Sequence, residues 1–243
     1  MVVFFHKRIF RRKAKNMIYY HFLKSEYAID DLEKKRIRVS TLDSLNDPFE
    51  LKPYLAFKER GPYYEVRKKI NKKWGLLCFS KDWRESLLWG HYADKHHGIA
   101  LGFEIHGGIK KVKYISKRVK IDLTKSNEKK EKLFLKKLAF RKYKNWKYEK
   151  EYRMWVELKK CKKDEDSEGG YYIEFNDNLK IKEIILGCKF NYEKKAEKIK
   201  ELAKINDVSI IIPTREEWSW FRVNPCGTKQ GKFFQEFKKE VNE

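Results

Sequence analysis

The stretch Lys147-Tyr148-Glu149-Lys150-Glu151-Tyr152-Arg153-Met154-Trp155-Val156 decides how we interpret the fold of this chain. Aromatic and β-branched residues alternate along it with charged ones, and it holds no Gly or Pro, so the pattern predicts a β-strand. The side chains of a strand point in turn to its two faces. Glu149, Glu151, Arg153 and Trp155 are therefore expected on one face, and the more apolar set is expected against a core.

The two carboxylates of this stretch have two interpretations. Glu149 and Glu151 would point the same way from one strand, in a chain that is otherwise strongly basic. One interpretation is a surface ladder of charges in which they pair with Arg153. The other is a catalytic Glu-x-Glu pair directed at a bound sugar. Composition and spacing leave both open.

Length and composition indicate a globular protein with an unusual charge. The 243 residues suit one domain with a substantial core, and an aromatic content of 15% predicts a core built on Phe, Tyr and Trp. Lys and Arg number 58 against 35 Asp and Glu, which gives a net charge of +23. Such a charge attracts polyanions and makes RNA or DNA an expected partner, although a coding bias toward Lys gives the same total.

The organisation along the chain predicts one domain with two charged ends. We expect a basic extension over 1–16, a single domain over 17–225 and a charged tail over 226–243. Short strands interrupted by helices predict an α+β fold of mixed, largely antiparallel sheets flanked by helices. No apolar run approaches the roughly 20 residues that span a membrane, so no membrane partner is expected. Four scattered Cys residues without a C-x-x-C pair favour a reducing cytoplasm and offer no metal site.

Periodicity and capping residues predict the elements along the chain. Helices are expected over 26–35, 64–73, 85–91, 129–143 and 192–206. Strands are expected over 17–22, 37–40, 76–80, 99–105, 112–114, 147–156, 171–175, 181–187, 208–212 and 218–223. A turn is expected over 43–50, and a charged hairpin tip or loop over 162–170.

Polar residues at strand ends are the first candidates for a site. His21 ends the first predicted strand, and Ser80 ends the strand over 76–80. A structural role for His21 and a helix N-cap role for Ser80 are the alternatives. The loop from His91 to His97 gathers three imidazoles, and a metal-dependent nuclease site there is one interpretation. The spacing does not match a helical metal pair, so hydrogen-bonded packing of a loop is the other.

Other motifs narrow the function classes. The sequence has no G-x-x-x-x-G-K-[ST], no G-x-G-x-x-G and no G-x-S-x-G, which disfavours a P-loop, a Rossmann dinucleotide site and a hydrolase triad. The stretch from Lys136 to Trp155 interleaves basic and aromatic residues. That mixture suits a nucleic-acid strand, and it equally suits a helix and strand whose Lys stems cover apolar surface.

Several short segments, taken in order, resemble the prokaryotic domain of unknown function 2971 family. The similarity runs from about Ile18 to Val223 and would place the chain with proteins that have no agreed activity. The segments that carry it are Leu45-Asn46-Asp47-Pro48-Phe49-Glu50, Cys78-Phe79-Ser80, Leu88-Trp89-Gly90-His91-Tyr92-Ala93-Asp94 with His96, Gly98 and Gly102-Phe103, Trp146-Lys147-Tyr148-Glu149-Lys150-Glu151-Tyr152-Arg153, and Ile184-Ile185-Leu186-Gly187.

A second resemblance concerns chemistry. His21, Ser80 and Glu149-Lys150-Glu151 are similar in order and type to the three short motifs of ADP-ribosyltransferases. That likeness implies a split sheet and NAD as co-substrate. It implies that His21 holds a ribose of NAD, that Ser80 braces the pocket, and that Tyr92, with His91 beside it, binds nicotinamide. Glu151 would bond the 2′-hydroxyl of the nicotinamide ribose, and Glu149 would orient or deprotonate the acceptor. The expected Ser-Thr-Ser of the second motif is here only Cys78-Phe79-Ser80.

These resemblances lead to one favoured function and two alternatives. The favoured function is an NAD-consuming, ADP-ribosyltransferase-like enzyme, such as a toxin or a phage-defence effector, with nucleic acid or protein as acceptor. One alternative is a nucleic-acid-binding module without catalysis. The other is a nuclease that uses the loop from His91 to His97.

Overall fold

The strand predicted over 147–156 begins later than expected. In the computed structural model, strand β8 spans Glu151–Glu157, and the residues before it form a 3₁₀ helix, η3, over Lys144–Glu149. Lys150 joins the two with a left-handed backbone, at a φ of 47°. Glu149 therefore does not share a strand face with Glu151, which corrects the prediction.

The structure describes residues 17–55, 59–120, 127–164 and 170–213. The basic extension over 1–16, the strand expected over 218–223 and the charged tail over 226–243 lie outside the described residues. Among the described helices, none is long and apolar enough to cross a membrane.

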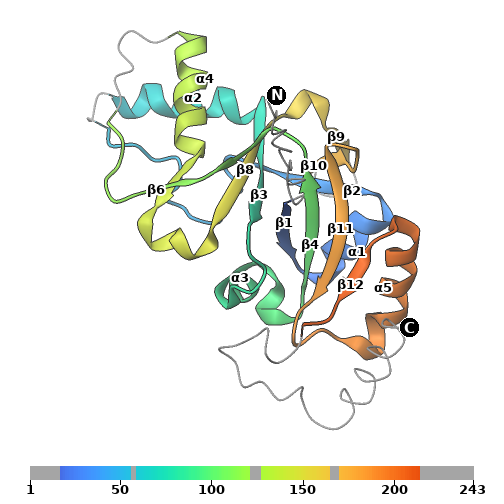
Figure 1. Cartoon of the computed structure of the whole chain (residues 1–243). Helices are drawn as coiled ribbons and strands as arrows, with labels where there is room; N and C mark the ends of the chain where they lie inside the picture. Colours follow the sequence, from blue (N-terminus) through green and yellow to red (C-terminus); the bar gives the residue numbers. More distant parts are fainter. Residues whose placement is uncertain (1–16, 56–58, 121–126, 165–169, 214–243) are drawn as a thin grey trace, which may run out of the picture.

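The strands form one large mixed sheet and a small pair, and the fold class is α+β, as predicted (Figure 1). The order in the large sheet is β12-β11-β4-β1-β3-β2-β10-β9, with β8 paired to β3 and β5 paired to β8. Its pairs are antiparallel except for β11 with β12, and β6 pairs with β7 separately and in parallel. The strand bounds are β1 Ile18–Leu23, β2 Arg36–Thr41, β3 Trp74–Ser80, β4 Ile99–Ile105, β5 Ile109–Lys111, β6 Lys113–Ile115, β7 Arg141–Tyr143, β9 Lys162–Asp164, β10 Gly170–Glu174, β11 Leu179–Leu186 and β12 Ser209–Ile211.

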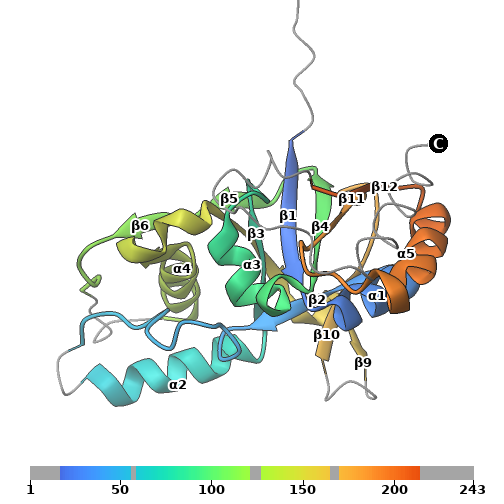
Figure 2. The same cartoon turned by 90° about the horizontal axis from the view of Figure 1, so that it is seen from below.

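Helices cover the sheet on two sides (Figures 1 and 2). Helices α1 and α5 lie beside each other against one part of the sheet, and α2 and α4 lie together on the opposite side of the molecule. The bounds are α1 Ser25–Glu33, α2 Arg60–Asn71, α3 Ser86–Tyr92, α4 Glu128–Ala139 and α5 Tyr192–Asn206, with short 3₁₀ turns η2 Asp94–His96 and η4 Leu158–Lys160. Helix α4 ends before the predicted residue 143 because Arg141–Tyr143 pairs with β6.

The side chains of β3 point in turn to two separate parts of the core. Leu77 and Phe79 pack in the cluster that includes residues of α1 and α5, whereas Leu76 packs in the cluster under α2 and α4. Full burial of each such side chain contributes about 1.5–3 kcal/mol. Cys78 lies on the same face as Leu76, and its partner across the ladder is Arg153. This face carries the polar cavity described below.

On the edge that does not face β8, strand β3 pairs with two different strands, one near each end. Strand β1 pairs with it only at Tyr20 and Ser80, and β2 pairs with it only at its other end, through Ser40 and Thr41. The backbone of Cys78 lies between these two contacts. All these strands still belong to one hydrogen-bonded sheet, so the split sheet implied by the second resemblance is not confirmed.

Two glycines that belong to the first resemblance, Gly98 and Gly187, lie where backbone segments pass very close to one another. A Cβ atom at Gly98 would lie 2.1 Å from the carbonyl oxygen of Leu23, and one at Gly187 would lie 2.2 Å from that of His96. The amide of Gly187 donates to the carbonyl of Gly98 at 3.0 Å. Any larger residue would separate these segments, which gives these positions a packing role.

Candidate active site

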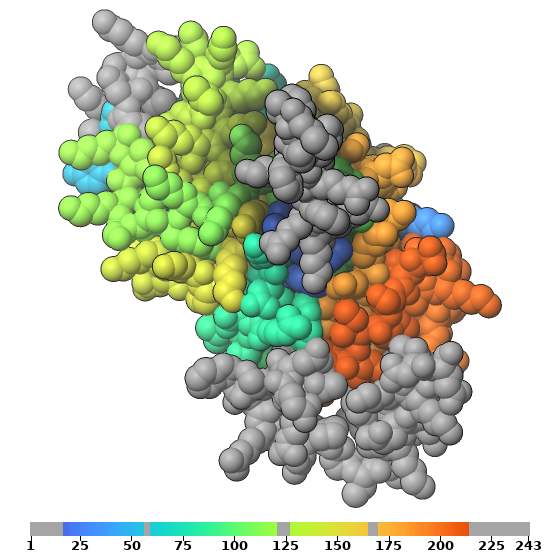
Figure 3. All heavy atoms as spheres, in the orientation of Figure 1, coloured from blue at the N-terminus to red at the C-terminus, as the bar shows by residue number. Residues whose placement is uncertain are grey.

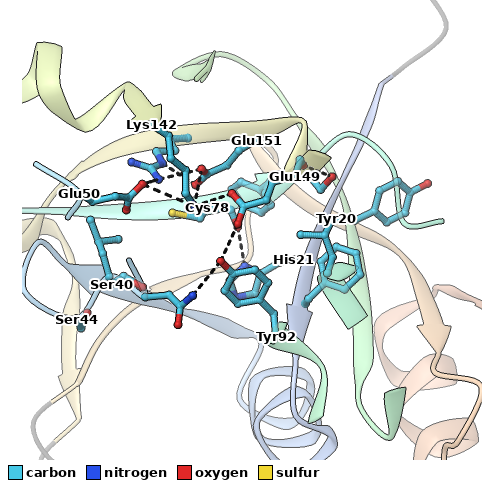
Figure 4. A pocket seen from close by; sticks show the side chains of 17 residues that line it. Tyr20, His21, Ser40, Ser44, Glu50, Cys78, Tyr92, Lys142, Glu149 and Glu151 are labelled. Atoms are coloured by element: carbon cyan, nitrogen blue, oxygen red, sulfur yellow. Dashed lines mark hydrogen bonds and ion pairs between the residues drawn. The ribbon is translucent and has the colours of Figure 1, made fainter. Parts of the chain in front are cut away.

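A cavity of about 290 Å³ lies where β1, β3 and β8 meet helix α3 and the segment before α2 (Figure 4). Five of the six predicted site residues line it, namely His21, Ser80, Tyr92, Glu149 and Glu151. They come from four separate parts of the chain. The structure therefore brings together the early imidazole and the later carboxylates in one cavity.

Both carboxylates reach this cavity in spite of the turn between them. Glu149 ends η3, and its backbone carbonyl accepts a hydrogen bond from Ser80 Oγ at 2.7 Å. Glu151 begins β8, and its amide donates to Tyr114 Oη at 2.8 Å. The left-handed Lys150 turns the chain so that two side chains from different elements converge.

Two cations and three carboxylates form a buried network beside the cavity. Lys142 Nζ lies 2.6 Å from Glu149 Oε2, 3.4 Å from Glu151 Oε2 and 3.7 Å from Glu50 Oε1. Arg153 donates from Nε and Nη2 to the two oxygens of Glu151, at 2.6 and 2.8 Å. Arg153 Nη2 also donates to Glu50 Oε1. All five side chains are buried, so the surface-ladder interpretation is wrong, and Arg153 pairs with Glu151 and Glu50 and not with Glu149.

The network shifts the pKa values of the two site carboxylates in opposite directions. Burial, followed by the charge of Glu151, raises the pKa of Glu149 to about 7, against the opposing charge of Lys142. Burial by itself would also raise the pKa of Glu151, but the charges of Arg153 and Lys142 outweigh it and hold that pKa below its ordinary value. Glu151 is thus a stable anion at neutral pH, whereas Glu149 can exchange a proton there.

The side chain of His21 contacts the edge of β3 between the positions that pair with β1 and with β2. Its Nδ1 lies 2.7 Å from the carbonyl oxygen of Cys78, the group that lies between the β1 and β2 contacts. A carbonyl only accepts, so Nδ1 carries the hydrogen, and Nε2 of the neutral ring is an acceptor. Burial lowers the pKa of His21, and the bond to Cys78 only partly opposes this. A neutral imidazole with a free acceptor suits a ligand hydroxyl.

Tyr92 links helix α3 to the network. Its Oη donates to Glu149 Oε1 at 2.8 Å and accepts from Asn46 Nδ2 at 3.4 Å (Figure 4). Burial, followed by the nearby charge of Glu149, raises the pKa of Tyr92, so the hydroxyl stays protonated. Ser80 does not cap a helix, because α3 begins only at Ser86. Ser80 instead holds the backbone of Glu149 in place.

His91 does not line the cavity. It is exposed, and its ring lies against Trp146 and Tyr148 at centroid distances of 6.0 and 6.3 Å. His96 instead stacks on Trp89, and His97 contacts the carbonyl of its own loop at Asp94. The three imidazoles of the predicted nuclease loop have different partners. In the described ranges, no group of three or more His, Cys, Asp or Glu side chains is arranged to hold a metal ion.

Three residues of the network were not predicted as site residues. Glu50 ends the Asn-Asp-Pro-Phe-Glu stretch, which was interpreted only as a turn, and its place in the first resemblance was the available signal. Arg153 was named only as a surface partner of the carboxylates. Lys142 is one of 58 Lys and Arg residues, and nothing in its neighbours distinguishes it.

The arrangement has the parts for chemistry at a sugar. It offers a fixed anion at Glu151, a proton acceptor at Glu149 and neutral polar groups at His21 and Tyr92. A fixed carboxylate stabilises positive charge as it develops, without any reorganisation during the reaction. The volume of about 290 Å³ is at the lower end of ligand pockets and suits one ring and a sugar.

No protein-family model, curated protein or solved structure matches this chain in comparisons of sequence and of structure. The case for a function therefore rests on the residues that line this cavity and on their geometry.

Proposed function

We propose that this protein is an NAD-consuming, ADP-ribosyltransferase-like enzyme whose active site is the cavity between His21, Glu149 and Glu151. The observation that carries the proposal is the convergence of these three side chains in one cavity, where the pKa of Glu149 is raised and the pKa of Glu151 is lowered. NAD is the co-substrate, and the cavity would take its nicotinamide and the adjoining ribose. We place the reaction in the cytoplasm, consistent with the free thiols of Cys78, Cys161 and Cys188.

Glu151 stabilises the transition state in this proposal. Cleavage of the glycosidic bond leaves its electron pair on the nicotinamide nitrogen and develops positive charge on the ribose. The carboxylate of Glu151 keeps its negative charge because Arg153 and Lys142 lie beside it. Arg153 also fixes the position of Glu151 through two hydrogen bonds, so the anion is already oriented before the reaction.

Glu149 receives the proton of the acceptor. A nucleophilic oxygen or nitrogen of the acceptor forms the new bond to the ribose carbon and releases one proton. A carboxylate whose pKa is about 7 is suited to take that proton at neutral pH. Tyr92 and Lys142, at 2.8 and 2.6 Å, hold the two oxygens of Glu149 in position for this step.

The direct test is release of nicotinamide from NAD. The purified protein is incubated with NAD alone and with RNA, DNA or cell lysate as the source of acceptor, and free nicotinamide is quantified by chromatography. We expect release by the wild type and a loss of roughly 100-fold or more in Glu151→Gln, because one preorganised electrostatic group is removed. Circular dichroism and thermal unfolding show whether the variant is folded.

The matched control is Glu157→Gln. Glu157 is the last residue of the same strand, does not line the cavity and pairs with Lys159 on the surface. We expect its rate to stay within about twofold of wild type, since surface ion pairs contribute little. Absence of release by the wild type with every acceptor, or an unchanged rate in folded Glu151→Gln, would overturn the proposal.

A further inference from the structure

A second cavity lies next to the first and has a different character. Its volume is about 540 Å³, and it is bounded by the segment 47–52, the segment 115–119, the end of α4 and the residues from β7 to Trp146. Glu50 and Lys142 line both cavities, so their buried ion pair forms a wall common to the two. A ligand in the second cavity would therefore be separated from the site carboxylates only by the side chains of Glu50 and Lys142.

The second cavity is lined by cations that have no carboxylate partner among the residues that the structure describes. Lys52, Lys117, Arg118 and Arg141 all border it, and among the described residues none of the four forms an ion pair with a carboxylate. Nη1 of Arg141 is buried and has no hydrogen-bond partner there. A buried guanidinium nitrogen without an acceptor is costly, and an anionic oxygen of a ligand would satisfy it. Phosphate is one of the anions that Arg binds through paired hydrogen bonds.

Aromatic rings line the same cavity beside these cations. Phe49 is 65% exposed, although it is fully apolar, and Lys52 and Arg118 lie over its ring at 5.6 and 6.0 Å from the centroid. Tyr143 is exposed, and Lys142 Nζ lies over the ring of Trp146, 4.7 Å from its centroid. Exposed rings interleaved with cations form stacking surfaces for bases, and they tolerate many sequences because every base has a flat face.

We infer that the second cavity binds single-stranded nucleic acid, with Arg118 and Arg141 on a phosphate and Phe49 under a base. A free dinucleotide is the less favoured occupant, because Glu50 and Lys142 line both cavities as a buried pair, and a small ligand that filled the two would have to displace them. A duplex is also disfavoured, because its bases are stacked on one another and cannot reach Phe49. The role of this cavity as the acceptor site rests on the proposed transferase function; the binding itself does not.

The test is binding of a fluorescein-labelled ten-nucleotide single strand, as DNA and as RNA, measured by fluorescence anisotropy without NAD. It uses the wild-type protein as the parent, because no transfer takes place when NAD is absent. We expect the double variant Arg118→Gln/Arg141→Gln to bind at least tenfold more weakly. We also expect the slope of log affinity against log salt to become less steep by roughly 0.7, the value for one lost phosphate contact on a single strand. Phe49→Ala is expected to weaken binding at least fivefold and to leave the slope unchanged.

The matched control removes the same charge elsewhere. Lys180→Gln/Lys204→Gln alters two exposed side chains of β11 and α5, which lie across the molecule from β6 and β7 (Figures 1 and 3). We expect its affinity and its slope to match the parent protein. The inference is overturned if both double variants weaken binding equally. It is also overturned if a duplex or an acidic peptide binds the parent protein as tightly as the single strand does, or if ADP displaces the strand at micromolar concentration.

The outcome is separable from that of the proposed function. Loss of binding in Arg118→Gln/Arg141→Gln alone supports the second cavity even if the wild type releases no nicotinamide. Release of nicotinamide that depends on Glu151 supports the enzyme even if no strand binds. If both hold, the labelled strand incubated with wild type and NAD should gain the mass of one ADP-ribose.

Discussion

Two residues of one type, Glu149 and Glu151, take different chemical roles because of their neighbours. Arg153 binds both oxygens of Glu151 and keeps it ionised. Glu149 has Lys142 on one oxygen and Tyr92 on the other, and burial beside a second carboxylate raises its pKa to about 7. Pairs of titratable groups whose surroundings separate their pKa values are typical of acid–base sites.

The raised pKa of Glu149 makes the stability of the protein depend on pH. Between about pH 4.5 and pH 7 the folded protein keeps a proton that the unfolded chain has released, so stability falls as pH rises through this window. The loss is roughly 3.5 kcal/mol, at about 1.4 kcal/mol for each of about 2.5 pH units. We expect the free energy of unfolding of wild type relative to Glu149→Gln to fall by this amount, measured by urea unfolding from pH 4.5 to 7.5.

Glu157→Gln is the control for this measurement. It removes a carboxylate from the same strand outside the cavity, so its difference from wild type should stay nearly constant over the same range. A wild-type difference from Glu149→Gln that does not change with pH would contradict the pKa of Glu149.

At the scale of elements, the junction between η3 and β8 forms the site. The 3₁₀ helix stops at Glu149, the strand starts at Glu151, and the left-handed Lys150 between them lets both side chains enter the cavity. A continuous strand would also have kept both on one face, but it would have carried Glu149 further along the ladder and away from Tyr92. The observed turn places a non-Gly residue, Lys150, at positive φ, at a cost of about 1–2 kcal/mol.

Substitution of Lys150 tests this junction. Lys150→Gly and Lys150→Val both remove the exposed ion pair with Asp82, so the comparison of the two isolates the backbone. We expect Lys150→Gly to be more stable than Lys150→Val by about 1–2 kcal/mol in chemical denaturation, because a β-branched residue is poorly tolerated at positive φ.

The same pair at Lys180 provides the reference. Lys180 is an exposed residue within strand β11, where Val is favoured over Gly. The order of stabilities should therefore reverse between the two positions. The same order at both would mean that Lys150 does not require a left-handed conformation.

At the scale of the whole molecule, the buried network joins parts that are far apart in the chain. Arg153 on β8 binds Glu50, which lies in the segment before α2, and also the carbonyl of Ala139 at the end of α4. Lys142 lies on β7, in the small parallel pair of strands, and forms ion pairs with Glu50 and Glu151. The network thus holds the segment that contains Glu50, the end of α4 and the β6–β7 pair against the large sheet, and two of its members line both cavities.

Removal of Arg153 should therefore destabilise the entire fold. In Arg153→Met, Glu50 and Glu151 lose the guanidinium between them and remain buried, and we expect a loss of about 3–5 kcal/mol in the free energy of unfolding at pH 7. The control is Lys162→Met, which breaks an exposed pair with Glu174 and should cost less than about 1 kcal/mol. Equal losses in the two variants, measured by guanidinium chloride unfolding, would contradict the structural role of the network.

Prediction from sequence succeeded where one periodicity covered a whole element. The strand Ile99–Ile105 and the helix Tyr192–Asn206 have the predicted bounds, because one is a continuous apolar run and the other has a clear helical stripe after Asn191, which caps it. It failed at Lys147–Lys150, where strand-like alternation continues through a segment that tertiary contacts hold as η3. The Ser80 hydroxyl and the Tyr92 hydroxyl, both distant in sequence, bind Glu149 there.

The sequence by itself determined the fold class, most of the elements and the types of residue available for chemistry, since these follow from local periodicity and composition. Only the tertiary structure decided that His21, Glu149 and Glu151 share a cavity, that Arg153 is buried and that Lys142 and Glu50 form its wall. The physical reason is that burial and partner choice depend on contacts between segments far apart in the chain, such as Glu50 and Arg153, which are 103 residues apart. The pKa values, and with them the proposed roles of the carboxylates, depend on those contacts rather than on neighbours in the chain.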